Sequence, residues 1–156
     1  EITTRLVGSE MCIRDRDILD CIKEAYEYQN NTFYSHPEYY ISYFEMRKNQ
    51  CQILHNLHYE MKKMRTMPKN AKIAADYLLN LAENITEYNN PEEQLSSLKE
   101  IIEHIKCDEL PTTMEEFESS VLLFHILMDI EDLLVYKKHF IDNVDKIQKK
   151  HYWKAG

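Results

Sequence analysis

The sequence predicts an all-α protein, an antiparallel bundle of about five helices. Apolar residues recur every three or four positions along most of the 156 residues, which is the spacing of one helix face. Glycine occurs only as Gly8 and Gly156. Because tight hairpin turns favour glycine at positive φ, a sheet rich in hairpins is hard to build from this chain. The same scarcity excludes the glycine-rich loops that bind phosphates and dinucleotides.

The first two helices are expected over residues 17–31 and 36–65. Ser35 can cap the second of them, and Pro37 suits its first turn. At a rise of about 1.5 Å per residue this second helix should be roughly 40 Å long. The predicted apolar positions are Ile18, Ile22 and Ala25 in the first helix, and Tyr40, Tyr43, Met46, Gln50, Ile53, Leu57 and Met64 in the second.

Two shorter helices follow, and each is expected to begin at or near a proline. Pro68 should open the third helix. The fourth has more start signals, since Asn90 can serve as N-cap, Pro91 can take the first helical position and Glu93 can reach back in a capping box. The predicted apolar positions are Ile73, Tyr77, Leu78, Leu81 and Ile85 in the third helix, and Leu95, Leu98, Ile102 and Ile105 in the fourth.

The last helix is expected over residues 114–148 and is the second long one. Thr113 and Glu116 stand at capping-box spacing where it begins. Its apolar stripe is wide, so we expect neighbours on several sides and a central place in the bundle. The predicted main face consists of Phe117, Val121, Phe124, Met128 and Val135, flanked by Leu123, Leu127, Ile130 and Leu134.

Charge is unevenly distributed along the chain. Residues 47–72 contain seven Lys or Arg and one Glu, whereas residues 83–132 contain fourteen Asp or Glu and two Lys. The favoured interpretation is solvated helix faces that partly complement each other within the bundle. The alternative is a basic surface, with Lys62, Lys63 and Arg65, that faces anionic lipid headgroups or the mouth of a transporter. A net charge of −8 and the lack of a recognised reading motif predict no nucleic-acid partner.

A cluster of aromatic residues is the main candidate site. Six of the eleven tyrosines fall within residues 26–43, directly before the run EMRKNQ. Their rings and Arg47 can form a pocket for a planar carboxylated molecule. They can also form a helix interface with buried rings and solvated hydroxyl groups, which the sequence favours. The candidate ligand or interface residues are Tyr39, Tyr40, Tyr43, Met46, Arg47 and Gln50.

The sequence contains only weak indications of a metal site or of catalytic residues. His55 and His58 lie three residues apart on one expected helix, a spacing that can place two imidazoles on one metal, but a third ligand is not evident. The Glu-x-x-His motif of di-iron bundles is missing from the sequence. Serines and cysteines are scattered within expected helices, without a strained turn that presents one of them to a base. We therefore expect no enzyme, no catalytic residue, no metal and no cofactor.

Two runs of sequence resemble the C-terminal domain of the bacterial aromatic acid exporter family. They are NNTFYSHPEYYISYFEMRKNQCQILHNLHYEMKKM and LPTTMEEFESSVLLFHILMDIEDLLVYKKHF, and the resemblance extends over residues 17–142. The most specific patterns are Tyr-Tyr-x-x-Tyr-Phe-x-Met-Arg-x-x-Gln at Tyr39–Gln50 and Leu-Pro-Thr-x-x-Glu-Glu-Phe-Glu at Leu110–Glu118. Similar proteins carry arginine where this chain has Met114 and Ser120.

The resemblance implies a place in a membrane transporter. An N-terminal transmembrane domain would precede this chain, and the helical domain would lie at the cytoplasmic face of the bacterial membrane. Candidate partners are that membrane domain, further copies of the chain and an aromatic acid ligand. The expected role is assembly, regulation or ligand sensing. The alternative is a free-standing soluble helical module that binds a small aromatic acid.

The N-terminal segment differs from the rest of the chain. The run LVGSEMCIRDR, residues 6–16, resembles the translation of sequencing-adapter DNA. We therefore expect residues 1–16 to be foreign to the protein, residues 17–150 to form the bundle and residues 151–156 to form a tail. The longest uncharged apolar run, SSVLLFHILM, has ten residues. Because a membrane span needs about 20, the fragment itself is expected to be soluble.

Overall fold

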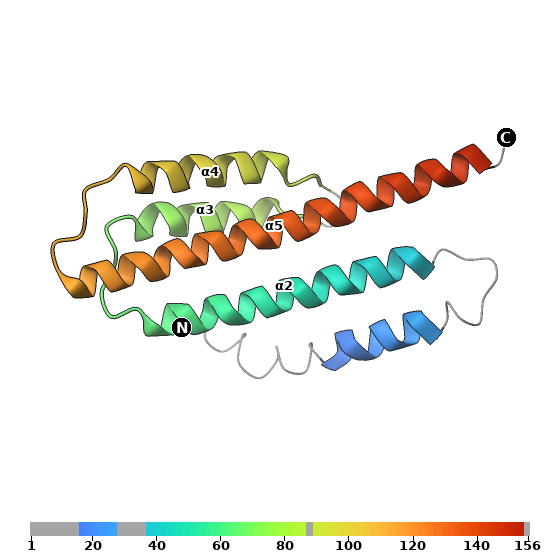
Figure 1. Ribbon diagram of the computed structural model, residues 1–156, viewed down its shortest axis with the longest axis horizontal. Coiled ribbons are helices and arrows are strands. Elements are labelled where there is room, and N and C mark those ends of the chain that lie inside the picture. Colours follow the sequence, from blue (N-terminus) through green and yellow to red (C-terminus); the bar gives the residue numbers. More distant parts are fainter. Residues whose placement is uncertain (1–15, 28–36, 87–88, 155–156) are drawn as a thin grey trace. The chain divides into compact units, whose positions relative to one another are not determined.

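Every element in the described part of the chain is a helix (Figure 1). The computed structural model describes the backbone of residues 16–27, 37–86 and 89–154, and the side chains of residues 16–27, 39–86 and 89–144. Residues 16–27 are helical, and they are followed by α2 (Pro37–Lys63), α3 (Ala71–Asn84), α4 (Glu92–Lys106) and α5 (Met114–Lys154). The all-α prediction is confirmed.

The chain forms two compact units. The described residues up to His55 and from His139 onward belong to the first unit, and Asn56–Lys138 is the second. Both α2 and α5 therefore contribute to each unit, whereas α3 and α4 belong to the second alone. Within that unit α3 and α4 lie side by side and run in opposite directions (Figure 1).

Most predicted helix limits agree with the structure to within a few residues. The predicted long helix over 36–65 is α2, while Ser35 and residues 28–31 lie outside the described residues. The third helix begins at Ala71 rather than Pro68, because residues 68–70 first make a turn in which the Ala71 N–H donates to the Pro68 carbonyl oxygen over 3.0 Å. The last helix continues to Lys154, beyond the predicted end at residue 148.

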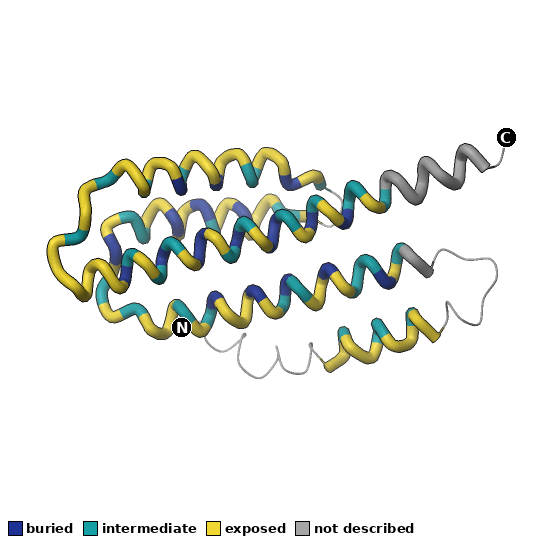
Figure 2. The backbone as a smooth tube through the Cα atoms, in the orientation of Figure 1, coloured by how far each residue is buried: buried dark blue, intermediate teal, exposed yellow. Residues whose placement is uncertain are grey.

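The core of the second unit is centred on α5. Leu98, Leu127 and Leu134 are fully buried, and Figure 2 shows buried positions recurring along one side of α5. The other apolar core residues of this unit are Leu57, Ala74, Tyr77, Leu81, Ile102, Leu123, Ile126, Ile130 and Leu133; those of the first unit are Ile41, Met46, Ile53 and Phe140. Tyr77 also donates its hydroxyl proton to the Gln94 carbonyl oxygen over 2.9 Å, and burial raises the pKa of Tyr77 to about 12.

The buried face of α5 is not the one that the sequence predicted. Phe117 is 50% exposed, Met128 40% and Val121 36%. The residues expected to flank the stripe are instead its centre: Leu123, Leu127, Ile130 and Leu134. Apolar residues surround so much of this helix that spacing alone permits either face, and the neighbouring helices decide between them. Ser119 and Lys137 join the buried face because both have hydrogen-bond partners there.

The predicted capping box at the start of α5 is confirmed. The Glu116 N–H donates to Thr113 Oγ1 over 3.2 Å, and the Thr113 N–H donates back to Glu116 Oε2 over 3.3 Å. The Thr112 hydroxyl and N–H donate to the same carboxylate oxygen over 2.9 and 3.0 Å. These bonds, those from Thr112 first, lower the pKa of Glu116. The box therefore pairs N–H groups that a helix start otherwise leaves unpaired.

The connection between α3 and α4 is closed by Asn89 and Lys137. Asn89 Nδ2 donates to the Asn84 carbonyl oxygen and its Oδ1 accepts from the Thr86 N–H, each over 3.0 Å. Lys137, only 3% exposed, donates its ammonium protons to the Thr86 carbonyl oxygen and to Asn89 Oδ1. Burial lowers the pKa of Lys137. The Lys137 ammonium group of α5 thus pairs with a backbone carbonyl oxygen in the connection that follows α3.

The start of α4 differs by one residue from the prediction. Pro91 is the N-cap, and the first helical residue is Glu92. Asn90 still contributes, because its Oδ1 accepts from the Glu92 N–H over 3.2 Å. The Glu92 carboxylate also pairs with Lys138 over 2.9 Å, which lowers the pKa of Glu92.

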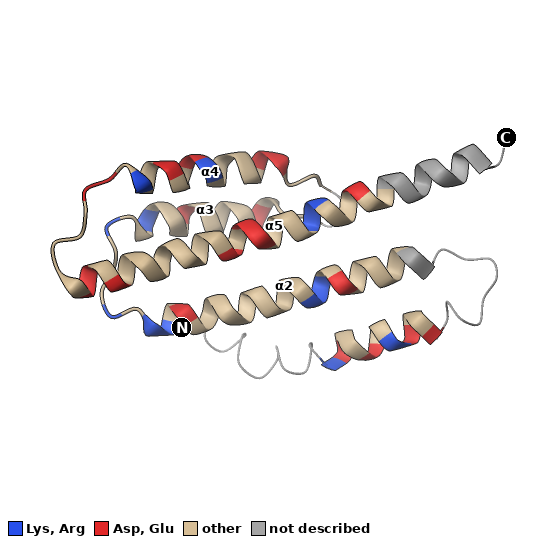
Figure 3. Ribbon diagram, viewed as in Figure 1, with Lys and Arg blue, Asp and Glu red and all other residues tan. Residues whose placement is uncertain are grey.

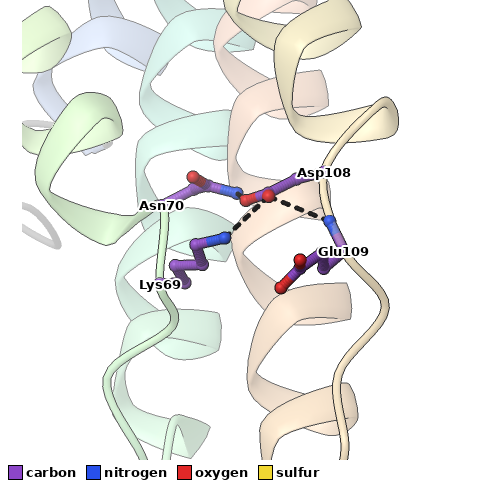
Figure 4. A network of polar contacts seen from close by, with 4 residues as sticks. All are labelled: Lys69, Asn70, Asp108 and Glu109. Carbon is purple, nitrogen blue, oxygen red and sulfur yellow. Dashed lines mark hydrogen bonds and ion pairs between the residues drawn. The ribbon is translucent and has the colours of Figure 1, made fainter.

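Asp108 joins the two loops at the other ends of α3 and α4 (Figure 4). Lys69 Nζ donates to its Oδ1 over 2.7 Å, Asn70 Nδ2 to its Oδ2 over 3.0 Å, and the Glu109 N–H to Oδ1 over 2.9 Å. Nearby, Thr66 Oγ1 lies 2.8 Å from the oxygen of buried Ser119. Loops that precede α3 and α5 are thereby fixed to their neighbours by polar side chains.

Replacing Leu127 with alanine should lower the free energy of unfolding by about 2 to 5 kcal/mol, because it leaves a cavity in a fully buried site. Urea denaturation measures the change. Met128→Ala is the matched control on the next, half-exposed residue and should cost less than about 1 kcal/mol. A larger loss for Met128→Ala than for Leu127→Ala would mean that α5 buries the face first predicted from its sequence.

The free energy of unfolding should fall in acid as the Asp108 carboxylate becomes protonated. Its hydrogen bond from Lys69, then those from the Glu109 N–H and Asn70, lower the pKa of Asp108 to about 2 in the folded chain. A depressed folded-state pKa stabilises the fold above the unfolded pKa, near 3.9, and that contribution disappears as pH falls from about 4 to about 2. Asp108→Asn should therefore flatten the acid limb of a melting-temperature profile.

Asp129→Asn is the control of opposite sign. Burial, with Glu60 and Asp132 nearby, raises the pKa of Asp129. Its ionised form is disfavoured by folding, so the asparagine variant should gain stability at neutral pH. If both variants changed the profile in the same direction, the roles assigned to these carboxylates would be wrong.

Candidate functional site

Three tyrosines of the predicted cluster, Tyr39, Tyr40 and Tyr43, lie in the first unit, at the N-terminal part of α2, whereas Tyr28 and Tyr34 lie outside the described residues. The Tyr39 and Tyr43 rings are nearly parallel, with centroids 6.4 Å apart and an interplanar angle of 7°. Both contact Phe140 of α5, with ring centroids 5.5 and 5.7 Å away. Phe44 packs edge-on against Tyr43 at 5.5 Å. The structure therefore adds Phe140 and Phe44 to the cluster; neither was among the candidate residues, although Phe44 is the phenylalanine of the pattern at Tyr39–Gln50.

The other candidate residues are divided between buried and exposed positions. Tyr40 is 55% exposed although its ring contacts Tyr39 at 5.4 Å. Met46 and Gln50 are buried. Arg47 is exposed and donates from Nη1 to Gln50 Oε1 over 3.2 Å, one turn along the same helix. The rings thus pack on Phe140, while the guanidinium contacts its own helix.

A second site is a groove in the second unit, at the C-terminal end of α2 and the N-terminal end of α5. Its volume is about 660 Å³. Its basic residues belong to the charged stretch noted in the sequence, and Met64, Phe117 and Val121 belong to the predicted apolar stripes. The lining residues are Lys62, Lys63, Met64, Arg65, Phe117, Glu118, Val121 and Leu122.

The electrostatics of this groove are dominated by cations. Lys62, Lys63 and Arg65 line it against one carboxylate, Glu118. Lys63 Nζ lies 4.2 Å from the centre of the Tyr59 ring, and none of the three cations forms an ion pair with a described residue. Figure 3 shows the basic end of α2 and the acidic first turns of α5. By contrast, Lys69 of the basic stretch pairs with Asp108 of the acidic stretch, as the favoured interpretation of the charges expects.

The histidines do not form a metal centre in the described part of the chain. His55 is exposed, and His58 Nε2 is buried without a hydrogen-bond partner. His125 Nδ1 lies 3.6 Å from Glu60 Oε1. Among the described residues, no three His, Cys, Asp or Glu side chains gather closely enough to hold a metal ion.

No described helix has both the length and the apolar character that crossing a membrane requires. A solved structure titled "Crystal structure of putative membrane protein from Clostridium difficile 630" has a similar fold, with a TM-score of 0.73 and 26% sequence identity. The match covers 83% of this chain and 76% of that one.

A curated relative is YqjA of Bacillus subtilis strain 168, described as an uncharacterized protein. It is 29% identical over 133 residues, which are 85% of this chain and 41% of YqjA. The chain therefore spans less than half the length of that relative.

The family model described as "Putative aromatic acid exporter C-terminal domain" matches residues 5–138. The match begins earlier than residue 17, where the resemblance noted from the sequence starts, and it includes the patterns at Tyr39–Gln50 and Leu110–Glu118. Covering most of the chain, it confirms that resemblance: the protein belongs to the family of aromatic acid exporter C-terminal domains.

Proposed function

We propose that this chain is the cytoplasmic-side domain of a membrane exporter of aromatic acids and that it acts in assembly or regulation of transport, not in covalent chemistry. The observation that carries the proposal is the family match over residues 5–138. The similar fold of a chain titled as a membrane protein supports it. A transmembrane domain encoded upstream and further copies of the chain would be its partners.

We further propose that the tyrosine cluster is a helix interface. Tyr39 and Tyr43 of α2 contact buried Phe140 of α5, which is the packing expected of aromatic side chains in a core. Arg47 bonds to Gln50. These contacts favour the interface over a pocket in which the rings and the guanidinium converge on one ligand.

Removal of this domain should impair the exporter. The natural reading frame upstream of Asp17 should encode several apolar segments of about 20 residues. Cells produce either that full-length protein or a version that ends just before Asp17 and so lacks this domain. Export of radiolabelled benzoate and the amount of transporter in the membrane are measured for both versions. A lower amount indicates an assembly role, and an unchanged amount with a changed export rate indicates regulation. If upstream DNA encodes no such segments, or truncation changes neither quantity, the proposal fails.

The interface proposal predicts a stability effect at Phe140. Phe140→Ala should lower the free energy of unfolding by about 3 kcal/mol or more, because it removes a buried ring that contacts two tyrosines. Tyr40→Ala, at the exposed edge of the cluster, should change it by less than about 1 kcal/mol. A small effect at Phe140 in urea denaturation would contradict the interface.

A further inference from the structure

The groove between the end of α2 and the start of α5 has two chemically different walls. Lys62, Lys63 and Arg65 come from the last turn of α2 and the residue pair after it. Phe117, Val121 and Leu122 come from the first turns of α5, with Met64 apolar as well. The volume of about 660 Å³ lies within the range of about 300 to 1,000 Å³ that is usual for small-molecule sites.

The cations of the basic wall are available to a ligand. None of them forms an ion pair with a described residue, and Lys63 lies over the Tyr59 ring. Three cationic residues and one carboxylate residue, Glu118, line the groove. The groove therefore has a local excess of positive charge, although the whole chain has a net charge of −8. A monoanion small enough to enter it would be attracted.

The apolar wall is incompletely covered by the protein. Phe117 is 50% exposed and Val121 36%, and they lie four residues apart, on one face of α5. Covering these side chains with an apolar group would remove them from water, which is favourable. A flat ring can stack on or pack edge-on against Phe117.

We infer that this groove binds a small aromatic carboxylate. The carboxylate would pair with the guanidinium of Arg65, which can form two parallel hydrogen bonds, and with the lysine ammonium groups. The ring would cover Phe117 and Val121. That the apolar part of the ligand is an aromatic ring rests on the proposed function. That the ligand is an anion with an apolar part is inferred from the charge and the apolar wall of the groove. Ligand sensing would then take place in the second unit and not at the tyrosine cluster.

The charges around the groove favour a small ligand over a lipid surface. Glu115 and Glu116 lie in the first turn of α5, and Glu118 lines the groove itself. A planar anionic bilayer would approach all three carboxylates together with the three cations. A single small anion inside the groove would meet the three cationic residues and only one carboxylate, that of Glu118.

Titration of the 156-residue chain with sodium benzoate, followed by amide nuclear magnetic resonance, tests this inference. Saturable shifts are expected at millimolar ligand for amides of residues 62–65 and 117–122. Benzyl alcohol, which keeps the ring but lacks the charge, should bind about tenfold more weakly or worse. Arg65→Gln should weaken benzoate binding about tenfold, because it removes the bidentate partner from an exposed position.

Arg47→Gln is the matched control. It removes the same charge from another exposed arginine of the basic stretch, beside the tyrosine cluster, and should leave benzoate binding unchanged. Loss of binding in Arg47→Gln but not in Arg65→Gln would overturn the inference, as would the absence of saturable shifts or equal binding of benzyl alcohol. The inference would also be overturned if the chain did not bind benzoate but bound phosphatidylglycerol vesicles, and if Arg65→Gln abolished that vesicle binding. Because no transport is measured, a negative result leaves the proposed exporter role standing.

Discussion

The scarcity of glycine constrains the described connections between the helices. No described residue has a positive φ angle, so the helix ends in that part of the chain do not close through the left-handed residue that glycine commonly supplies. Polar side chains instead bond to the backbone groups and side chains at these helix ends. Asn89 and Lys137 close the connection after α3, Asp108 joins the loops before α3 and α5, and Thr113 with Glu116 caps α5. The closures made by Lys137 and Asp108 join residues that lie 51 and 39 positions apart in the sequence.

Local features of this fold were predictable from sequence, and distant ones were not. The capping box of Thr113 and Glu116 was predictable because its two residues are three positions apart. The start of α3 was placed too early, at Pro68, since the turn that follows this proline is held by Asp108, which lies 38 and 39 positions from Asn70 and Lys69. Nothing near Pro68 in the sequence signals that contact.

The face of α5 illustrates the same limit for packing. Its apolar residues are spread widely: Phe117 was predicted on the main face and Leu127 beside it, but the structure buries Leu127 and leaves Phe117 half-exposed. Lys137 is polar by type, yet it is buried because Thr86 and Asn89 receive its protons. For the candidate site, the spacing of Tyr40 and Tyr43 predicted one apolar stripe, but Tyr40 is 55% exposed, and Tyr43 packs on Phe140 of another helix. The groove likewise joins residues that no single pattern connects.

Dependence on α5 has a consequence for how the chain is made. A ribosome releases α3 and α4 well before α5, and domains generally begin to fold as they emerge. The Thr86 carbonyl oxygen, however, has its hydrogen-bond partner Lys137 51 residues later in the chain. Likewise, Ser119, the partner of the Thr66 hydroxyl, is synthesised 53 residues after Thr66. Phe140, which completes the aromatic packing of the first unit, emerges later still. Neither unit can therefore finish folding during synthesis of α2, α3 and α4, and a nascent chain stalled before residue 114 would expose the apolar faces that α5 normally covers.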